Sequence, residues 1–375
     1  MLLDADHAMI RDAVRDYVHA EIAPHAAAWA RARHFPRQAL RGLGALGCLG
    51  IAVPTQWDGA GLDYLALALA LEEIAAGDGA TSTIVSVNNC PVCSILLAAA
   101  DDAQRERWLR PLARGEAIGA FALTEPQAGS DASNLRTTAR RDGDHYVLDG
   151  VKQFITSGAN AAAAIVIAAT DRAAGKRGLS AFLVPTDAPG YIVERIEDKA
   201  GQHASDTAQI RFDGCRVPAS ARLGAEGDGY RIALSGLEGG RIGIAAQSVG
   251  MARAAFDAAQ RYAHDRSSFG RPIFEHQAVQ FRLAEMATRI EAARQLLWHA
   301  ASLKDAGRPC LTEAAMAKLN ASEMAERVCS DAMQIHGGYG YVEDFPVERI
   351  WRDARVCQIY EGTSDVQKIL IARAL

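Results

Sequence analysis

The stretch Ile118-Gly119-Ala120-Phe121-Ala122-Leu123-Thr124-Glu125-Pro126-Gln127-Ala128-Gly129-Ser130-Asp131 marks a change in the pattern of the sequence. Before it, residues 1–115 carry apolar side chains at helical spacing. After it, short apolar runs alternate with turns as far as residue 222, and helical periods return over 223–375. Helices followed by strands and then helices argue against alternating βαβ units. The sequence therefore predicts an α+β chain with three domains: 1–115, 116–222 and 223–375.

The same patterns predict the individual elements. Apolar residues from Ile10 to Ile22 recur at the spacing of one amphipathic helix that runs from Asp4 to about Arg31. Further helices are expected at 37–47, 62–76, 84–99 and 102–113. Strands are expected at 118–123, 145–148, 164–167, 179–184 and 209–212, although the third run is rich in alanine, which also favours helices. From Gly229 we expect helices with breaks at 270–272, 307–309 and 337–340.

Composition excludes several classes of protein. The 375 residues include 40 basic and 45 acidic side chains, a net charge of −5, so no overall field attracts nucleic acid or an anionic membrane. Asp4, Asp6 and His7 stand where a signal peptide would be basic and then apolar. No continuous apolar run of the roughly 18 residues that a membrane span needs is found. Seven scattered cysteines in such a chain favour a reducing, cytoplasmic location.

Two short strings resemble binding motifs but lack the context that those motifs need. Gly42-Leu43-Gly44-Ala45-Leu46-Gly47 spells GxGxxG, yet a helical pattern precedes it where a dinucleotide-binding fold has a strand. Cys90-Pro91-Val92-Cys93 spells CxxC, yet no second CxxC or histidine pair completes four zinc ligands. We interpret the glycines as a helix end and the cysteines as core residues, and we expect no metal.

Three loops have the composition of ligand-binding sites. The loop 122–131 follows a strand with glycine, serine and aspartate, which suit a polar heterocycle or a phosphate. In 334–341, Gln-Ile-His-Gly-Gly-Tyr-Gly-Tyr, adjacent glycines allow a ligand to approach the backbone closely. In 266–273, Arg266 and Arg271 flank a bend and suit a diphosphate.

A glutamate near the C-terminus is the candidate catalytic base. Glu361 lies in Tyr360-Glu361-Gly362-Thr363-Ser364, between the apolar segment 356–359 and an expected closing helix at 366–375. Gly362 permits unusual backbone angles, and Ser364 with Gln367 fits a capping box that starts the helix. Because most glutamates in turns are simply solvated, the assignment depends on the three loops.

Together, in this order and at these spacings, the segments resemble the acyl-CoA dehydrogenase family along essentially the whole chain. Segments 122–131 and 334–353 are similar to that family's signatures, and residues 360–363 to its catalytic turn. The resemblance implies an N-terminal α-helical domain, a middle β-barrel-like domain and a C-terminal four-helix bundle. It also implies a homotetramer with one FAD per subunit, an acyl-CoA substrate and an electron-transfer flavoprotein as partner.

The resemblance also assigns site residues. Contacts to the flavin fall on Phe121, Leu123, Thr124, Gly129, Ser130, Phe154, Ile155 and Thr156. A neighbouring subunit supplies the contacts to diphosphate and adenine, which are Arg266, Ser268, Phe269, Gln277, Gln334, Gly337 and Gly338. Thr363 and Asp365 also contact FAD. The substrate contacts are Ser130, Glu238, Arg241 and Gly362.

In the implied reaction Glu361 removes the α-proton of a saturated acyl thioester while the flavin accepts the β-hydride, giving a trans-2-enoyl-CoA. The backbone N–H of Glu361 and a ribityl hydroxyl stabilise the enolate oxygen, and burial raises the pKa of the base. Phe154, Glu238 and Asp365 depart from the commonest family residues, tryptophan, aspartate and glutamine, so substrate preference is the property most affected. We expect short or medium acyl chains, including branched ones.

Two alternatives remain open. An acyl-CoA oxidase would use O2 on the same fold, but the chain lacks the extra C-terminal domain and the Ser-Lys-Leu ending of those proteins. A non-catalytic CoA- or flavin-binding scaffold would be expected to lack the base, and Glu361 is present.

Overall fold

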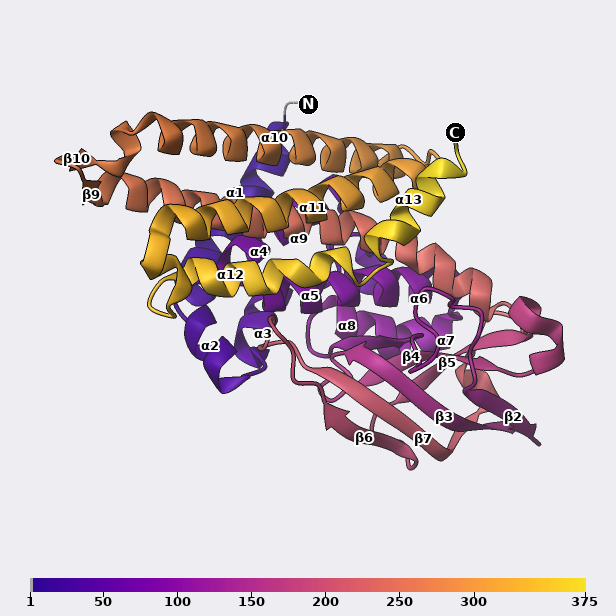
Figure 1. Cartoon of the computed structure of the whole chain (residues 1–375). Helices are drawn as coiled ribbons and strands as arrows, with labels where there is room; N and C mark the ends of the chain where they lie inside the picture. The colour runs from indigo at the N-terminus through magenta and orange to yellow at the C-terminus, as the bar shows by residue number, and fades with distance from the viewer. Residues whose placement is uncertain (1–2) are drawn as a thin grey trace.

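Helices from the two ends of the chain pack together beside a β domain (Figure 1). The computed structural model describes residues 3–375. One hydrophobic core joins α1, α4, α9, α10 and α11. A second core lies between the helices around residues 87–113 and one face of the sheet, and a third fills the inside of the β domain.

The N-terminal region is helical, as predicted, but more broken than the periodicity suggested. Its elements are α1 (Ala5–Glu21), α2 (Ala26–Ala32), α3 (Arg37–Ala45), η1 (Thr55–Trp57), α4 (Tyr64–Gly77), α5 (Gly79–Val87), η2 (Asn88–Cys93), α6 (Ser94–Ala99), α7 (Asp102–Gln104), η3 (Arg105–Leu109) and α8 (Arg110–Ala113). The single helix expected from Asp4 to Arg31 is wrong: it ends before Pro24, which lacks the N–H that a continuing helix needs. The helix expected at 84–99 is kinked at Cys90, whose φ of −138° and ψ of 114° are not helical, immediately before Pro91.

One stretch contradicts the prediction that no apolar run is long enough to span a membrane. Within residues 3–375, Gly79–Ala99 is long and apolar enough to cross a membrane by length and composition, with a mean hydropathy of 1.5. The sequence prediction missed it because threonine, serine and asparagine interrupt the apolar residues without adding charge. However, 78% of its 18-residue apolar window is buried inside the protein, as is typical of a core helix.

The middle of the chain forms one sheet, and all five predicted strands are confirmed. Its strands are β1 (Gly119–Ala122), β2 (Thr138–Asp142), β3 (His145–Thr156), β4 (Ala163–Ala169), β5 (Leu179–Pro185), β6 (Tyr191–Ile196), β7 (Thr207–Pro218) and β8 (Arg222–Leu223), with helical turns η4 (Arg172–Gly178) and η5 (Ala219–Ala221). The alanine-rich run is a strand because it is buried on both faces. Ile165 and Ile167 face the core shared with the helices, while Val166 faces the inside of the β domain. Strands β2, β6 and β8 were missed because they are short or carry exposed polar residues.

The sheet curves back on itself. Its strand order is β6-β7-β3-β2-β4-β5-β8, and β1 pairs with β4. Strands β2 and β4 pair only at Thr138 and Ala169. Across the interior, the rings of Tyr146 on β3 and Phe182 on β5 lie 4.9 Å apart. The sheet therefore folds over a shared core, which is the barrel-like form that the resemblance implied, with β6 and β8 as its two ends.

The C-terminal region returns to helices with the three expected breaks. Its elements are α9 (Gly229–Asp265), β9 (Ser267–Ser268), β10 (Arg271–Pro272), η6 (Ile273–Glu275), α10 (Gln277–Asp305), α11 (Leu311–His336), η7 (Gly337–Tyr341), α12 (Pro346–Arg355), η8 (Val356–Gln358) and α13 (Ser364–Ala372). Helix α9 starts beside the β domain and carries the β9–β10 hairpin to the opposite end of the molecule (Figure 1).

Candidate active site

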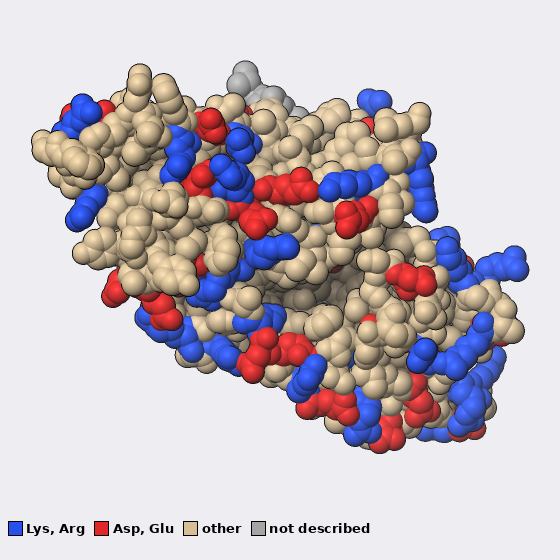
Figure 2. All heavy atoms as spheres, in the orientation of Figure 1, with Lys and Arg blue, Asp and Glu red and all other residues tan. Residues whose placement is uncertain are grey.

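A hollow opens between the helical body and the β domain, below the end of α12 (Figure 2). Acidic and basic side chains are interspersed over most of this face. The chain leaves α12 through η8 and turns at residues 359–363 into α13. The candidate base therefore lies where helices and sheet meet.

The turn around Glu361 has an unusual backbone. Glu361 has a φ of 52° and Gly362 a φ of 88°. Sequence reasoning expected such angles at Gly362, but a positive φ at a glutamate is uncommon and marks strain that the surroundings must hold. The Glu361 side chain points at α9, because a Cβ added to Gly240 would lie 2.8 Å from Glu361 Oε2.

Gly240 is a functional position that sequence reasoning missed. It lies with Gly239 in the interior of a 37-residue helix, within its first third, where glycine lowers helix stability. A Gly-Gly pair inside a strongly helical pattern is the signal that would have indicated a close approach. Here the approaching group is the carboxylate of Glu361, the candidate base.

Glu361 is half-buried, and the Oε2 of its carboxylate is inaccessible to water. Its Oε2 has no hydrogen-bond partner among residues 3–375. Burial raises the pKa of Glu361 to about 7, against the opposing effects of the Arg241 and Lys318 cations. Arg241 is itself 6% exposed and its Nε has no partner within the described chain. A carboxylate with a pKa near the working pH suits a general base.

The start of α13 differs from the predicted capping box. Thr363, not Ser364, is the N-cap, and its side chain accepts a hydrogen bond from the Val366 N–H. The third helical position is then Val366, whose side chain has no oxygen that could accept a hydrogen bond and complete a capping box. Gln367 instead donates to the carbonyl oxygens of Glu361 (3.1 Å) and Gly362 (2.9 Å). Ser364 Oγ is buried without a partner in the described part of the chain.

A buried polar network holds Tyr360, the residue before the base. The Tyr360 hydroxyl donates to Gln247 Oε1 on α9 at 2.7 Å and accepts from Gln202 Nε2 at 3.3 Å. Gln202 also donates to the Asp353 carbonyl at the end of α12. Thr83 Oγ1 on α5 donates to Gln202 Oε1 at 2.6 Å. The network ties the turn to these helices and to the β6–β7 loop, and no pattern in the sequence indicates it.

The predicted flavin contacts on the β side lie together. The Gln153 N–H donates to the Thr124 carbonyl at 2.8 Å, which places the end of β3 beside the loop after β1. Phe154 has a φ of 60° and is 61% exposed. Close to it, Ser157 Oγ is buried without a partner in residues 3–375. Within the loop, Gly129 and Ser130 are exposed.

One residue of this loop has a different task. Glu125 is buried and bonded to Lys152 Nζ at 2.8 Å, and Lys152 has no exposed surface. Glu125 also accepts hydrogen bonds from the backbone N–H groups of Arg136 (2.6 Å) and Thr137 (3.0 Å). This carboxylate therefore holds the loop in place rather than facing a ligand.

The predicted substrate contacts on α9 are about one helical turn apart. Glu238 forms an ion pair with Lys304 at 2.9 Å and accepts from Cys310 Sγ at 3.4 Å. Its charge is therefore already balanced by α10, a pairing that the sequence did not reveal. Arg241 lies deeper, beside Glu361.

The predicted diphosphate and adenine contacts gather at the far end of the bundle. Arg266 lies over the Tyr339 ring, with its guanidinium carbon 5.8 Å from the ring centre. Phe269, at the tip of the β9–β10 hairpin, is 96% exposed. Gln277, Gln334, Gly337 and Gly338 are also exposed there. This end and the β domain lie at opposite ends of one chain (Figure 1).

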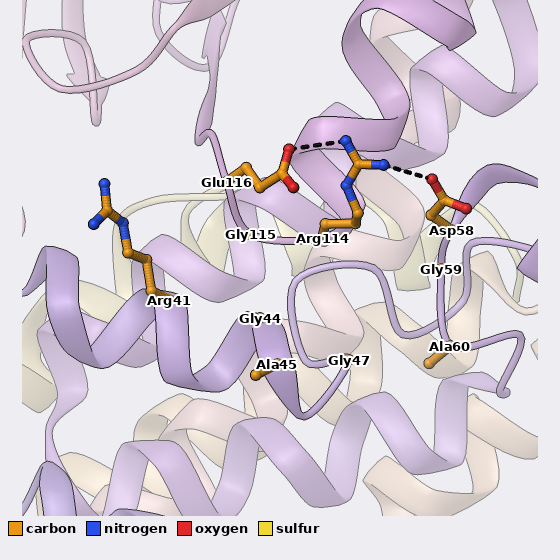
Figure 3. A pocket seen from close by; sticks show the side chains of 10 residues that line it. All are labelled: Arg41, Gly44, Ala45, Gly47, Asp58, Gly59, Ala60, Arg114, Gly115 and Glu116. Carbon is orange, nitrogen blue, oxygen red and sulfur yellow. Dashed lines mark hydrogen bonds and ion pairs between the residues drawn. The ribbon is translucent and has the colours of Figure 1, made fainter.

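The GxGxxG and CxxC strings both have structural explanations. The GxGxxG glycines end α3, and no strand leads into them. Gly44 and Gly47 line a surface pocket of about 620 Å³ in which Arg114 pairs with Asp58 and Glu116 (Figure 3). Cys90 and Cys93 are buried free thiols, and residues 3–375 contain no cluster of three or more potential metal ligands.

Family profiles match nearly the whole chain. The N-terminal, middle and C-terminal domains of acyl-CoA dehydrogenase match residues 4–116, 120–215 and 227–375. The chain belongs to the acyl-CoA dehydrogenase family. It is an FAD-dependent oxidoreductase that dehydrogenates acyl-CoA thioesters, as the motifs predicted.

Individual members of the acyl-CoA dehydrogenase family are similar over 90% or more of their length. The short-chain specific mitochondrial acyl-CoA dehydrogenase of Bos taurus is 47% identical over 370 residues, which cover 99% of this chain and 90% of that protein. Butyryl-CoA dehydrogenase from Megasphaera elsdenii has a TM-score of 0.96 at 39% identity, covering 100% of this chain and 99% of that one. A chain from a structure of the electron transferring flavoprotein of Acidaminococcus fermentans has a TM-score of 0.98 at 44% identity, covering 100% and 98%.

The residues of this acyl-CoA dehydrogenase fit FAD. The exposed ring of Phe154 offers an apolar surface to a planar heterocycle, and the nearby unpaired Ser157 hydroxyl offers a polar contact. An added Cβ at Gly129 would meet no atom within 4 Å, so the loop after β1 leaves open space. At the far end of the bundle, Gly337 and Gly338 are equally open, beside the exposed Arg266.

Proposed function

We propose that this protein oxidises short-chain acyl-CoA thioesters with Glu361 as the base and an electron-transfer flavoprotein as acceptor. The observation that carries the proposal is the Glu361 carboxylate held against Gly240, with its Oε2 buried and unpaired within residues 3–375 and a pKa of about 7. The short chain is supported by the similarity to short-chain specific and butyryl-CoA dehydrogenases. The acceptor is supported by the similar chain in the electron transferring flavoprotein structure.

In the proposed reaction the thioester lies in the hollow with its α-carbon beside Glu361. The Glu361 carboxylate, whose Oε2 has no hydrogen-bond partner among residues 3–375, takes the α-proton. The backbone N–H of Glu361, which has no acceptor within residues 3–375, is free to donate to the thioester oxygen as negative charge develops there. FAD, when bound, supplies the hydride acceptor. Arg241 and Lys318 balance the negative charge of the base between turnovers.

We also propose a homotetramer in which two chains complete each cofactor site. Phe121, Leu123, Thr124, Gly129, Ser130, Phe154, Ile155, Thr156, Thr363 and Asp365 would come from one chain. Arg266, Ser268, Phe269, Gln277, Gln334, Gly337 and Gly338 would come from its neighbour. The distance of the hairpin from the β domain in Figure 1 supports this division. The domain boundaries 1–115, 116–222 and 223–375 and the cytoplasmic location stay proposals; seven free, buried cysteines support a reducing compartment.

The deciding experiment compares wild type with Glu361→Gln by anaerobic mixing with butyryl-CoA. We expect the variant to bind flavin normally but to reduce it about 100- to 10,000-fold more slowly, because the amide cannot accept the α-proton. Glu323→Gln, an exposed carboxylate on α11, is the matched control. Rapid flavin reduction by Glu361→Gln would disprove the role of the base.

The same assay separates the alternatives. Acyl-CoAs of graded length and branching should reduce wild-type flavin best when short, and an optimum at long chains would contradict the short-chain proposal. Rapid hydrogen peroxide production in air would favour the oxidase. A purified protein that never binds FAD would favour the non-catalytic scaffold.

A further inference from the structure

A fully buried lysine lies beneath the catalytic turn. Lys318, on α11, has no exposed surface, and its Nζ donates to the Gly362 carbonyl at 2.7 Å. Lysine is almost never fully buried unless it is paired. Within residues 3–375, however, no carboxylate lies within ion-pair distance of Lys318. The burial of this charge is therefore unexplained by packing alone.

The Gly362 carbonyl is held from two sides. Lys318 approaches from α11, and Gln367 Nε2 approaches from α13 at 2.9 Å. Gln367 also holds the Glu361 carbonyl, and a Cβ on Gly362 would lie 2.6 Å from its amide nitrogen. Two donors from separate helices thus fix the peptide next to the base, in a turn whose two positive φ angles need such support.

We propose that Lys318 is a positioning residue for catalysis, which fixes the Gly362 carbonyl and so aims the Glu361 carboxylate at the substrate. The proposal rests on the proposed role of Glu361 as the base. Gly240 on α9 lies against the carboxylate, so a small rotation of the turn would press Glu361 against that helix. Displacement of a catalytic group by about 1 Å can cost about 100-fold in rate.

The charge of Lys318 adds a second effect. The charged or titratable groups that act on this region are Arg241 from α9, Lys318 from α11, Cys357 from η8 and Cys90 from η2. Burial lowers the pKa of Lys318 to about 8, so the ammonium form predominates at neutral pH. Its cation favours the carboxylate form of Glu361 and keeps the base available.

The test uses the flavin-loaded enzyme and three variants. Lys318→Met keeps most of the aliphatic side chain but removes the hydrogen-bond donor and the charge. Lys318→Gln keeps a neutral donor. Gln367→Met removes the second hydrogen-bond donor to the Gly362 carbonyl. Flavin reduction by butyryl-CoA is measured anaerobically as a rate per bound flavin, over a range of substrate concentrations and pH. Lys368→Met is the matched control, because Lys368 is an exposed lysine on α13 that pairs with Glu323 at 3.6 Å.

We expect Lys318→Met to lower the limiting reduction rate about 10- to 100-fold while the apparent Kd changes less than about threefold. Its rate should also rise with pH at higher values than in wild type, because the carboxylate has lost a stabilising cation. Lys318→Gln and Gln367→Met should show smaller losses of rate, and the Gln367→Met pH profile should not move. Lys368→Met should match wild type.

Each other outcome contradicts either the role of Lys318 or the proposed function on which that role rests. A wild-type rate per flavin and pH profile in Lys318→Met would overturn the positioning role, even if that variant were less stable. Failure of all three variants to fold would show a purely structural role. If wild type itself is not reduced by any acyl-CoA, the proposed function fails rather than the role of Lys318.

Discussion

At the scale of the residue, the unusual feature is a carboxylate that reaches a helix backbone. Glu361 adopts a φ of 52° and approaches α9 where Gly240 leaves room for it. The same placement removes the carboxylate from water and raises its pKa to about 7. The strained backbone of Glu361, the glycine at position 240 and the raised pKa of the carboxylate thus all belong to one arrangement, in which Glu361 packs against α9. That geometry is where the reaction would begin.

The raised pKa predicts how activity depends on pH. The carboxylate form is the base, and below a pKa of about 7 its fraction falls about tenfold per pH unit. We therefore expect kcat/KM for butyryl-CoA to rise with pH up to about 7 and then to level off. Stopped-flow reduction from about pH 5.5 to about pH 8.5 measures this. A flat profile over the acid half of that range would contradict an essential base with this pKa.

At the scale of the element, the loop after β1 depends on a buried ion pair. Lys152 on β3 and Glu125 are 2.8 Å apart, and both are almost completely buried. Burial lowers the pKa of Lys152 to about 8, while Lys152 and the backbone donors outweigh burial and lower the pKa of Glu125. Because the loop carries proposed flavin contacts on both sides of Glu125, its stability and cofactor binding should change together.

Removing one partner of this pair should destabilise the protein strongly. We expect Glu125→Gln to lower the free energy of unfolding by about 3–5 kcal/mol, since it leaves a buried cation without its carboxylate. The double variant Glu125→Gln/Lys152→Met should recover much of the loss, because no buried charge remains. Urea denaturation and flavin content measure both effects. Glu194→Gln breaks the surface pair with Arg211 as a control and should cost at most about 1 kcal/mol.

Elements with a strong pattern were predictable from the sequence, and long-range contacts were not. Even the alanine-rich β4 was recognised, since its isoleucines and valine form a short apolar run between turns. The helix breaks near Pro24 and Pro91 were not predicted, because the helical spacing of apolar residues continues across each proline. Glu361 was identified through its turn, but Lys318 was not. Its contact spans 44 positions of sequence, and a lysine on an amphipathic helix normally faces water.

At the scale of the whole molecule, the proposed FAD contacts fall into two groups on different parts of the chain. The β domain lies at one end of the molecule, whereas the β9–β10 hairpin projects from the opposite end of the helical bundle (Figure 1). Phe269 at the hairpin tip is 96% exposed and Tyr341 is 84% exposed. Aromatic side chains this exposed are typical of surfaces that are covered in an assembly.

This arrangement predicts that two variants that each fail to bind FAD should bind it again when they assemble together. Arg266→Glu should lose flavin by placing a negative charge beside the diphosphate, and Phe154→Asp by removing the apolar surface while keeping a residue that tolerates positive φ. Each variant alone should purify nearly colourless. Co-expressed, they should form mixed assemblies in which one chain's intact β domain meets the other chain's intact hairpin, and flavin absorbance should return in part. Size-exclusion chromatography with light scattering shows whether each variant still assembles. If the mixture stays colourless while both variants assemble, each site belongs to a single chain and the proposed tetramer has no role in binding FAD.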